Sequence, residues 1–167
     1  MKKILFTLAL LISFSSFGQT AEEYYKKAEE KSASKDYYGA IADLTKAAEL
    51  GMEFAYFKRG AAKQDLGDDE GALKDYTVFI NKGGTYVFAF RERAGIYYNK
   101  DMFQEALEDY LTSISVDPSE EYVNHPYYSI GLCRAALEDM DGACKDWKKA
   151  SSLGNKEASK MLIKYCN

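Results

Sequence analysis

The sequence predicts an all-α fold made of four copies of one helical hairpin, and three observations lead to that prediction. First, a pattern of Ala, an apolar residue, any residue, Asp and a large apolar residue occurs four times, starting at Ala40, Ala72, Ala106 and Ala143. Second, an aromatic residue stands 16 positions before each of these alanines, at Tyr24, Tyr56, Phe90 and Tyr127. Third, the four alanines are 32, 34 and 37 residues apart while the offset of 16 never changes, so each unit is one rigid object and the connections absorb the difference.

Each unit divides into two helices. A small residue follows each aromatic by four positions, which places both on one helical face; these residues are Ala28, Gly60, Ala94 and Gly131. The apolar positions after each key alanine make a second amphipathic helix, and turn-like runs at 34–36, 66–69, 99–101 and 138–141 separate the two. Small residues that face each other let antiparallel helices approach closely. We expect the aspartates Asp43, Asp75, Asp109 and Asp146 on the solvated side, paired with Arg or Lys of a neighbouring unit.

The units should cover about 21–52, 53–86, 87–119 and 124–154. The fourth is expected to start at Asn124, with Pro126 in the first turn of its helix, where proline is tolerated. Residues 155–166 carry apolar or small side chains at helical spacing, interrupted by lysines. This pattern predicts a final helix that caps the open end of the stack.

The N-terminal segment has the three parts of a secretory signal peptide. Lys2 and Lys3 precede a short apolar run, and small residues at Ser16 and Gly18 follow, so we expect cleavage after Gly18. The alternative, a membrane anchor, needs about 20 apolar residues, and the uninterrupted run is well short of that. The predicted organisation is a signal peptide at 1–18 and one domain at 19–167, exported to the periplasm of a bacterium or beyond the cell.

Three cysteines, Cys133, Cys144 and Cys166, lie near the end of a chain predicted to be exported, where oxidation is permitted. If the last helix folds back about the turn at Leu153 and Gly154, Cys166 comes close to Cys144. We therefore expect a Cys144–Cys166 disulfide that holds the capping helix. Two alternatives stay open: Cys133 competes for one of these partners, or all three cysteines are reduced and buried.

These units resemble tetratricopeptide repeats, a family of helical hairpins of about 34 residues. The four aromatics sit where the first aromatic of that family sits, and Pro118 falls at its closing proline. Tyr37 and Phe103 match its turn aromatic, whereas Asp69 and Met140 depart from it. Segments 46–51 and 149–158 are also similar to Sel1-like repeats, a longer relative of the same hairpin. The resemblance implies a right-handed superhelical stack of antiparallel helix pairs, with four repeats and the capping helix.

The resemblance also implies a concave groove lined by the first helix of each unit. Carried over position by position, the groove residues expected here include Tyr25, Phe57, Gln64, Arg91, Tyr98, Asn99, His125 and Tyr128. Some members of the family grip a terminal carboxylate with Lys and Asn at set positions, and this sequence lacks that clamp. An aromatic wall with Arg91 suits apolar or aromatic peptide segments.

Composition narrows the function classes. The chain has 22 basic and 26 acidic side chains, and removal of residues 1–18 takes the formal charge from −4 to −6, which argues against a nucleic-acid partner. A single histidine leaves little for a catalytic triad or a metal site, so we expect no enzyme, no cofactor and no metal. The sequence favours an exported module that binds a protein or peptide. The alternatives are a glycan or small-molecule binder, or an accessory subunit of an envelope complex.

Overall fold

The computed structural model describes residues 19–118 and 120–166, with only the backbone described for 120–125, so the signal peptide expected at 1–18 lies outside it. The described part folds into nine α-helices and contains no strand. The helices are α1 (Ala21–Ala33), α2 (Tyr37–Glu49), α3 (Phe54–Asp65), α4 (Asp69–Asn81), α5 (Val87–Asn99), α6 (Phe103–Val116), α7 (Glu120–Ala136), α8 (Met140–Ser152) and α9 (Lys156–Tyr165). The prediction of an all-α helical-repeat solenoid is confirmed.

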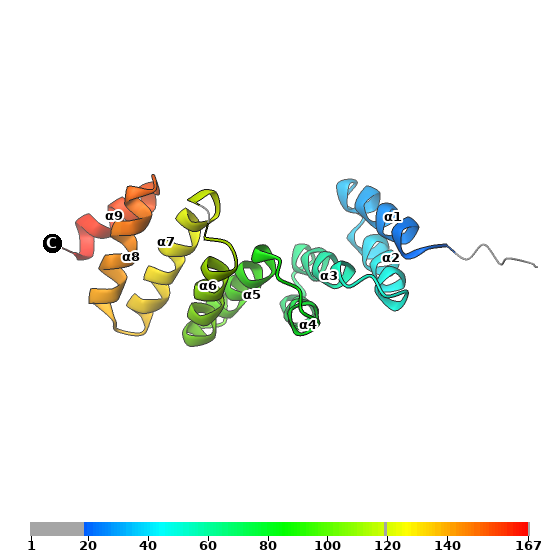
Figure 1. Ribbon diagram of the computed structural model, residues 1–167, viewed down its shortest axis with the longest axis horizontal. Coiled ribbons are helices and arrows are strands. Elements are labelled where there is room, and N and C mark those ends of the chain that lie inside the picture. Colours follow the sequence, from blue (N-terminus) through cyan, green and yellow to red (C-terminus); the bar gives the residue numbers. More distant parts are fainter. Residues whose placement is uncertain (1–18, 119, 167) are drawn as a thin grey trace, which may run out of the picture.

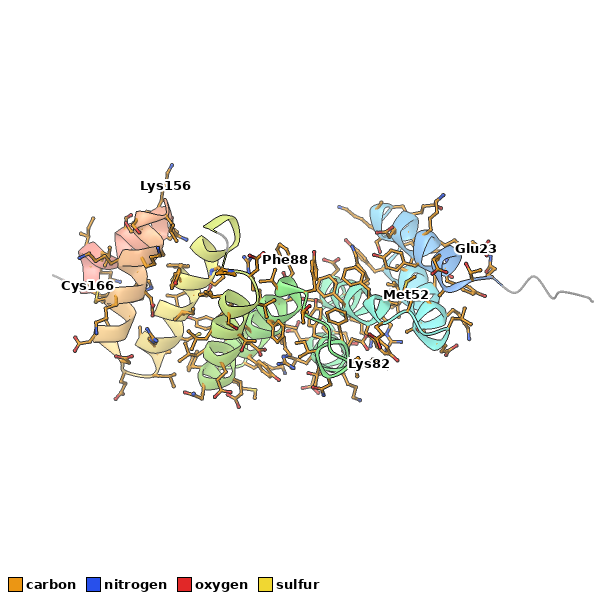
Figure 2. The ribbon with its side chains drawn as sticks, in the orientation of Figure 1. Glu23, Met52, Lys82, Phe88, Lys156 and Cys166 are labelled. Atoms are coloured by element: carbon orange, nitrogen blue, oxygen red, sulfur yellow. A yellow bond between two sulfur atoms is a disulfide. The ribbon has the colours of Figure 1, made fainter. Side chains whose placement is uncertain are left out.

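The helices follow one another along the long axis of the molecule, from α1 at one end to α9 at the other (Figure 1). Every substantial helix–helix contact in the described part joins two helices that are consecutive in the chain. Side chains fill the space between successive pairs along the whole length (Figure 2). Such a stack is stabilised by nearest-neighbour interfaces, as in other solenoids. We call α1, α3, α5 and α7 the first helices and α2, α4, α6 and α8 the second helices.

The predicted contact of small residues is present in the first and third units. Ala28, Ala40, Ala94 and Ala106 are fully buried, which lets the two helices of their units lie close together. In the second and fourth units a glycine faces a large ring instead. A Cβ added at Gly60 would lie 2.8 Å from Tyr76 Cε1, and one at Gly131 would lie 2.4 Å from Trp147 Nε1. These glycines are therefore required by the close approach of an aromatic side chain.

This contact gives a prediction with a matched control. Gly131→Ala should lower the free energy of unfolding by about 1 to 3 kcal/mol, because the buried indole of Trp147 must move to admit the new methyl group. Gly95→Ala, also inside a first helix, should raise it by about 0.5 to 1 kcal/mol, because its Cβ would meet only the Tyr110 hydroxyl at 3.8 Å. Urea unfolding followed by circular dichroism measures both. Equal effects of the two substitutions would contradict the proposed packing.

Three of the four repeated aspartates are buried, Asp43 is half-buried, and all four are paired inside their own unit, so the expectation of a solvated position and a partner in a neighbouring unit is wrong. Asp75 and Asp109 are only 2% and 6% exposed. Arg59 donates from Nε and Nη2 to the two carboxylate oxygens of Asp75, at 2.8 and 2.6 Å. Arg93 does the same with Asp109, at 2.7 Å for both bonds. The pairs in the two outer units are Lys31 with Asp43 and Arg134 with Asp146.

The position of these aspartates follows from helical spacing. Each stands three residues after a buried alanine, on the face that meets the first helix of its unit. A buried carboxylate is costly unless it is paired and hydrogen-bonded, and a bidentate arginine meets both needs. The remaining arginine nitrogen links neighbouring units, because Nη1 of Arg59 and of Arg93 donates to Thr45 and Thr77 of the preceding second helix, at 3.0 and 3.1 Å.

Three of the four second helices begin with the same cap. Asp36, Asp68 and Asp139 each accept a hydrogen bond from the backbone N–H of a glycine three residues later, at 3.0, 2.9 and 2.9 Å. A long cationic side chain of the first helix passes over each of these glycines. A Cβ added at the glycine would lie 2.8 or 2.9 Å from the Cδ of that side chain, which is Lys31, Lys63 or Arg134. The third unit has Glu105 in place of the glycine, and Asp109 takes its cation from Arg93, one turn earlier in the first helix.

The fourth unit starts earlier than expected. Helix α7 begins at Glu120, not at Asn124, and Pro126 lies inside it instead of in its first turn. Proline inside a helix removes one backbone hydrogen bond and crowds the preceding turn, which usually ends or bends the helix. Here Pro126 is fully buried, so packing of its ring offsets part of that cost. No helix in the described part of the chain is both long enough and apolar enough to cross a bilayer.

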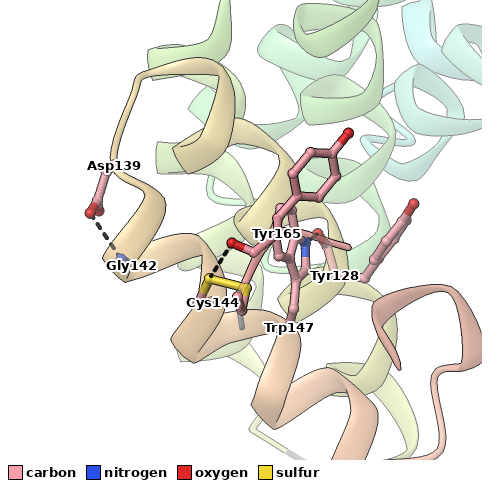
Figure 3. Close-up of a disulfide and its surroundings, with 7 residues drawn as sticks. Tyr128, Asp139, Gly142, Cys144, Trp147 and Tyr165 are labelled. Atoms are coloured by element: carbon pink, nitrogen blue, oxygen red, sulfur yellow. Dashed lines mark hydrogen bonds between the residues drawn. A yellow bond between two sulfur atoms is a disulfide. The ribbon is translucent and has the colours of Figure 1, made fainter. Parts of the chain in front are cut away.

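Helix α9 packs along α8 and closes the end of the stack. The structure joins Cys144 of α8 to Cys166 by a disulfide with a sulfur–sulfur distance of 1.98 Å, and Cys133 takes no part in it (Figure 3). Burial raises the pKa of the Cys133 thiol to about 12, which keeps it protonated and unreactive. Beside the disulfide, the rings of Tyr165 and Trp147 are 6.1 Å apart, and Trp147 Nε1 donates to the Tyr128 carbonyl at 3.3 Å.

Candidate functional site

A pocket of about 320 Å³ lies between the first helices of the second and third units; we call it the central pocket. Its lining is Phe57, Ala61, Gln64 and Asp65 of α3, Tyr76 of α4 and Glu92 of α5. Two residues expected in the groove, Phe57 and Gln64, therefore take part in it. The Tyr76 hydroxyl donates to Gln64 Oε1 at 2.9 Å and fixes the orientation of that amide.

The central pocket is negatively charged. Its two carboxylates, Asp65 and Glu92, come from different helices, and no Lys or Arg belongs to its lining. Partial burial raises the pKa of Glu92 above its ordinary value, and the charge of Asp65 raises it further, while the neighbouring Arg91 opposes both effects. Within the described residues, no ion pair joins Glu92 or Asp65 to a cation.

A smaller pocket between α1 and α3 is balanced in charge. It is lined by Ala28, Glu29, Ser32, Leu44 and Lys58, and has a volume of about 140 Å³. Here the Lys58 ammonium lies 3.9 Å from a carboxylate oxygen of Glu29, so the pocket carries its own counter-ion. Lys58 and Glu92 occupy the same position of their units, two residues after the first aromatic. The third unit has Glu92 where the second unit has Lys58, and this difference makes the central pocket acidic.

A second large pocket, also of about 320 Å³, lies toward the end of the stack; we call it the terminal pocket. Its lining is Tyr98 of α5, Leu132, Ala135 and Ala136 of α7, Met140 and Trp147 of α8, and Met161 and Tyr165 of α9. None of these side chains is charged. Helix α9 supplies one wall, so the capping helix and the disulfide that fixes its end also shape this pocket.

Gly95 lies on α5 between the two pockets in sequence, with Glu92 three residues before it and Tyr98 three residues after it. A Cβ at Gly95 would meet only the Tyr110 hydroxyl at 3.8 Å. The surface above this glycine is therefore open, in contrast to the crowded surroundings of Gly131.

The remaining residues expected in the groove have other surroundings. Tyr25 is half-buried, its ring 6.3 Å from that of Phe54, and burial together with Glu29 raises its pKa to about 12. Arg91 stacks over Phe88 at 5.2 Å, and burial lowers its pKa. Tyr128 packs beside Trp147. Asn99 is exposed at the end of α5 and belongs to neither pocket, and the side chain of His125 lies outside the described residues.

Phe57 is mainly a core residue. It is 8% exposed, and its ring lies 5.7, 6.0 and 4.9 Å from the rings of Tyr76, Phe79 and Tyr86. Phe54 likewise packs between units, against Tyr25 and Tyr86. The aromatic content of the first helices therefore serves the contacts between units more than the open surface, and the groove is less aromatic than the sequence suggested.

Several residues that line the pockets were not expected in the groove, among them Tyr76, Glu92, Met161 and Tyr165. Glu92 stands one residue after Arg91, an expected groove residue. Alignment of the units also shows that Glu92 has the opposite charge to Lys58 at the equivalent position, which could have indicated a special role. Tyr76 comes from a second helix, and the other two come from the capping helix, where the family pattern has no groove positions. Among the described residues, no group of three or more His, Cys, Asp or Glu side chains could hold a metal ion.

Comparisons with known proteins give the same fold. No protein-family model matches the chain. Human tetratricopeptide repeat protein 6 is 25% identical over 87 residues, which are 52% of this chain and 17% of that protein. The chain spans about a fifth of the length of the curated relatives it matches.

Two solved structures extend the comparison over most of the chain. MamA matches with a TM-score of 0.73 at 25% identity, covering 83% of this chain and 81% of MamA. YrrB, described as a TPR protein with an unusual peptide-binding site, matches with a TM-score of 0.72 at 20% identity, covering 86% of this chain and 74% of YrrB. At such identities the likeness to YrrB establishes the fold alone. The protein has the tetratricopeptide-type fold, an all-α solenoid of helical hairpins.

Proposed function

We propose that this protein is an exported, non-enzymatic interaction module that binds an extended segment of a partner protein along its first helices. The observation that carries the proposal is the pair of pockets on successive first helices, with an open surface above Gly95 between them in the chain. Pockets that receive side chains along an open groove are the usual means by which a helical-repeat surface holds a peptide. Export rests on the signal-peptide pattern of residues 1–18.

The packing of the stack supports this function. Buried arginine–aspartate pairs bond to a threonine of the preceding unit, and the disulfide fixes the last helix, so the groove is formed before a partner arrives. A preformed surface loses little conformational entropy on binding, and more of the contact energy is kept as affinity. The same rigidity suits a scaffold better than an enzyme that closes on its substrate.

The burial of Trp147 weakens one of the alternative functions, the glycan binder. A glycan binder would use exposed Tyr and Trp side chains that stack on sugar rings. The only tryptophan, Trp147, is 1% exposed, and its Nε1 already donates to a backbone carbonyl. The ring of Trp147 therefore offers almost no surface on which a sugar could stack, which removes the tryptophan from the support for a glycan binder.

Blocking the groove tests the proposal. Gly95→Trp places a large ring on the open surface, whereas Gly95→Ala changes the same backbone position without filling it. We expect the alanine variant to retain native partners from an extract of the source cell envelope, and the tryptophan variant to lose them by tenfold or more, measured by quantitative mass spectrometry of captured proteins. Circular dichroism must show both variants folded. Equal recovery by the two variants would contradict binding in the groove.

A further inference from the structure

The central pocket stands out because its carboxylates lack the counter-ions that this chain supplies elsewhere. Asp75 and Asp109 are each held by an arginine, and Asp75 has Lys63 in addition, at 2.8 Å. In the pocket between α1 and α3, Glu29 is paired with Lys58. Glu92 is partly buried and faces the like charge of Asp65, yet it has no ion-pair partner among the described residues.

Arg91 attracts the Glu92 carboxylate electrostatically but forms no ion pair with it among the described residues. Arg91 precedes Glu92 in the sequence, but its guanidinium lies over the ring of Phe88, 5.2 Å from the ring centre, and Arg91 does not belong to the pocket lining. Two carboxylates at the edge of a cavity with a partly desolvated wall repel each other. A cation entering the cavity would relieve this repulsion and gain charge-assisted hydrogen bonds.

The shape and lining of the pocket suit a cationic side chain better than a free metal ion. The two carboxylates are accompanied by the methyl group of Ala61 and by the buried rings of Phe57 and Tyr76, which form an apolar floor against which the aliphatic part of a lysine or arginine can lie. The volume of about 320 Å³ is larger than one ion needs.

The terminal pocket has the complementary character. Its lining is uncharged and includes Leu132, Met161 and the rings of Tyr98 and Tyr165, which suits an apolar side chain. The two pockets share helix α5, because Glu92 and Tyr98 lie within two turns of that helix. An extended peptide rises about 3.3 Å per residue, so a short segment can span positions two helical turns apart.

We propose that the groove selects a peptide with two features: a lysine or arginine side chain that enters the central pocket, and an apolar side chain that enters the terminal pocket. This inference rests on the proposed function and names the chemistry of the partner. Asp65 and Glu92 bind the charged group of the basic side chain, while Tyr98 and Tyr165 contact the apolar side chain. The acidic balance of the whole chain adds a long-range attraction for a basic segment.

The test is selection from a display library of random 12-residue peptides by the purified protein. Peptides enriched on the wild type should carry a lysine or arginine at a fixed distance from an apolar residue. The double variant Asp65→Asn/Glu92→Gln should bind these peptides about 10- to 100-fold more weakly, since each carboxylate supplies charge-assisted hydrogen bonds. Its control is Glu105→Gln/Glu108→Gln, which makes the same change in net charge at exposed positions of α6 and should bind as the wild type does.

The outcomes separate this inference from the proposed function. If the enriched peptides carry no basic residue but Gly95→Trp abolishes their binding, the charge selection is wrong and the groove function stands. Equal weakening in the control variant would reduce the effect to net charge and overturn the inference. If the wild type enriches no peptide more than Gly95→Trp does, both are overturned.

Discussion

Asp109→Ala is expected to lower the free energy of unfolding by about 3 to 5 kcal/mol, because it leaves a charged arginine unpaired inside the stack. The side chain of Arg93 is only 14% exposed, and Asp109 accepts hydrogen bonds from both its Nε and its Nη2. The guanidinium cannot escape the penalty in the variant by losing its proton, because arginine stays charged in proteins. Urea unfolding followed by circular dichroism measures the loss.

Two further variants make this prediction specific. Glu108→Ala removes the exposed carboxylate next to Asp109 in the sequence and should change the free energy of unfolding by no more than about 0.5 kcal/mol. Adding Arg93→Met to Asp109→Ala should recover part of the stability, because no buried charge is then left without a partner. A double variant less stable than Asp109→Ala would show that the arginine stabilises the stack by means other than the ion pair.

Removing the disulfide should cost about 3 kcal/mol, as expected for a cross-link that closes a loop of this length. The Cys144→Ser/Cys166→Ser variant changes both sulfurs, which are 22 residues apart in the sequence, and leaves no new free thiol. We expect the loss to concentrate in α9, because its substantial contacts in the described part are with α8 alone. Hydrogen exchange should then show faster exchange in α9 than in α3 or α5.

Reductant provides the control for the disulfide. Wild-type protein in a thiol reductant should fall to the stability of the double variant, and the double variant should not respond to the reductant at all. Mass spectrometry of a non-reduced digest should recover the peptides of Cys144 and Cys166 as one species. Alkylation of Cys144 without prior reduction would contradict the cross-link.

The repeat architecture was predictable because its signal is local and occurs four times. The fixed offset of 16 between aromatic and alanine reports the geometry of one hairpin, and the small residues report where two helices touch. Gly60 and Gly131 illustrate this, since each is required by a ring that lies 16 residues further along the chain. The expected pairing of Cys144 with Cys166 followed from the direction of one turn.

The sequence-based predictions were wrong about the repeated aspartates and about Pro126, because their environment depends on which face of a helix another helix covers. The aspartates looked like solvated residues because charge is normally exposed, and their burial became visible only with Arg59 and Arg93 in place across the hairpin. Similarly, Pro126 was read as a helix start because that is its commonest position in a helix. Its burial inside α7 depends on tertiary packing that no local pattern reports.

The pockets were predictable only in part. Gln64 and Tyr98 were found because the family pattern places them on the groove side of the first helices. Glu92 was missed because the pattern does not include its position, although its charge is opposite to that of Lys58 in the preceding unit. The wall made by Tyr165 depends on how the capping helix is docked, which amphipathic spacing alone does not fix.

The central claim is that one face of the first helices binds a peptide, and mapping a selected peptide onto the backbone by NMR tests it most directly. Titration of a selected 12-residue peptide should shift the amide signals of Ala61 in the central pocket, Leu132 in the terminal pocket and Gly95 on the helix α5 that the two pockets share. Signals of the exposed residues on α4 and α6 should stay in place. Shifts gathered on those second helices, with the three groove residues unchanged, would contradict the claim.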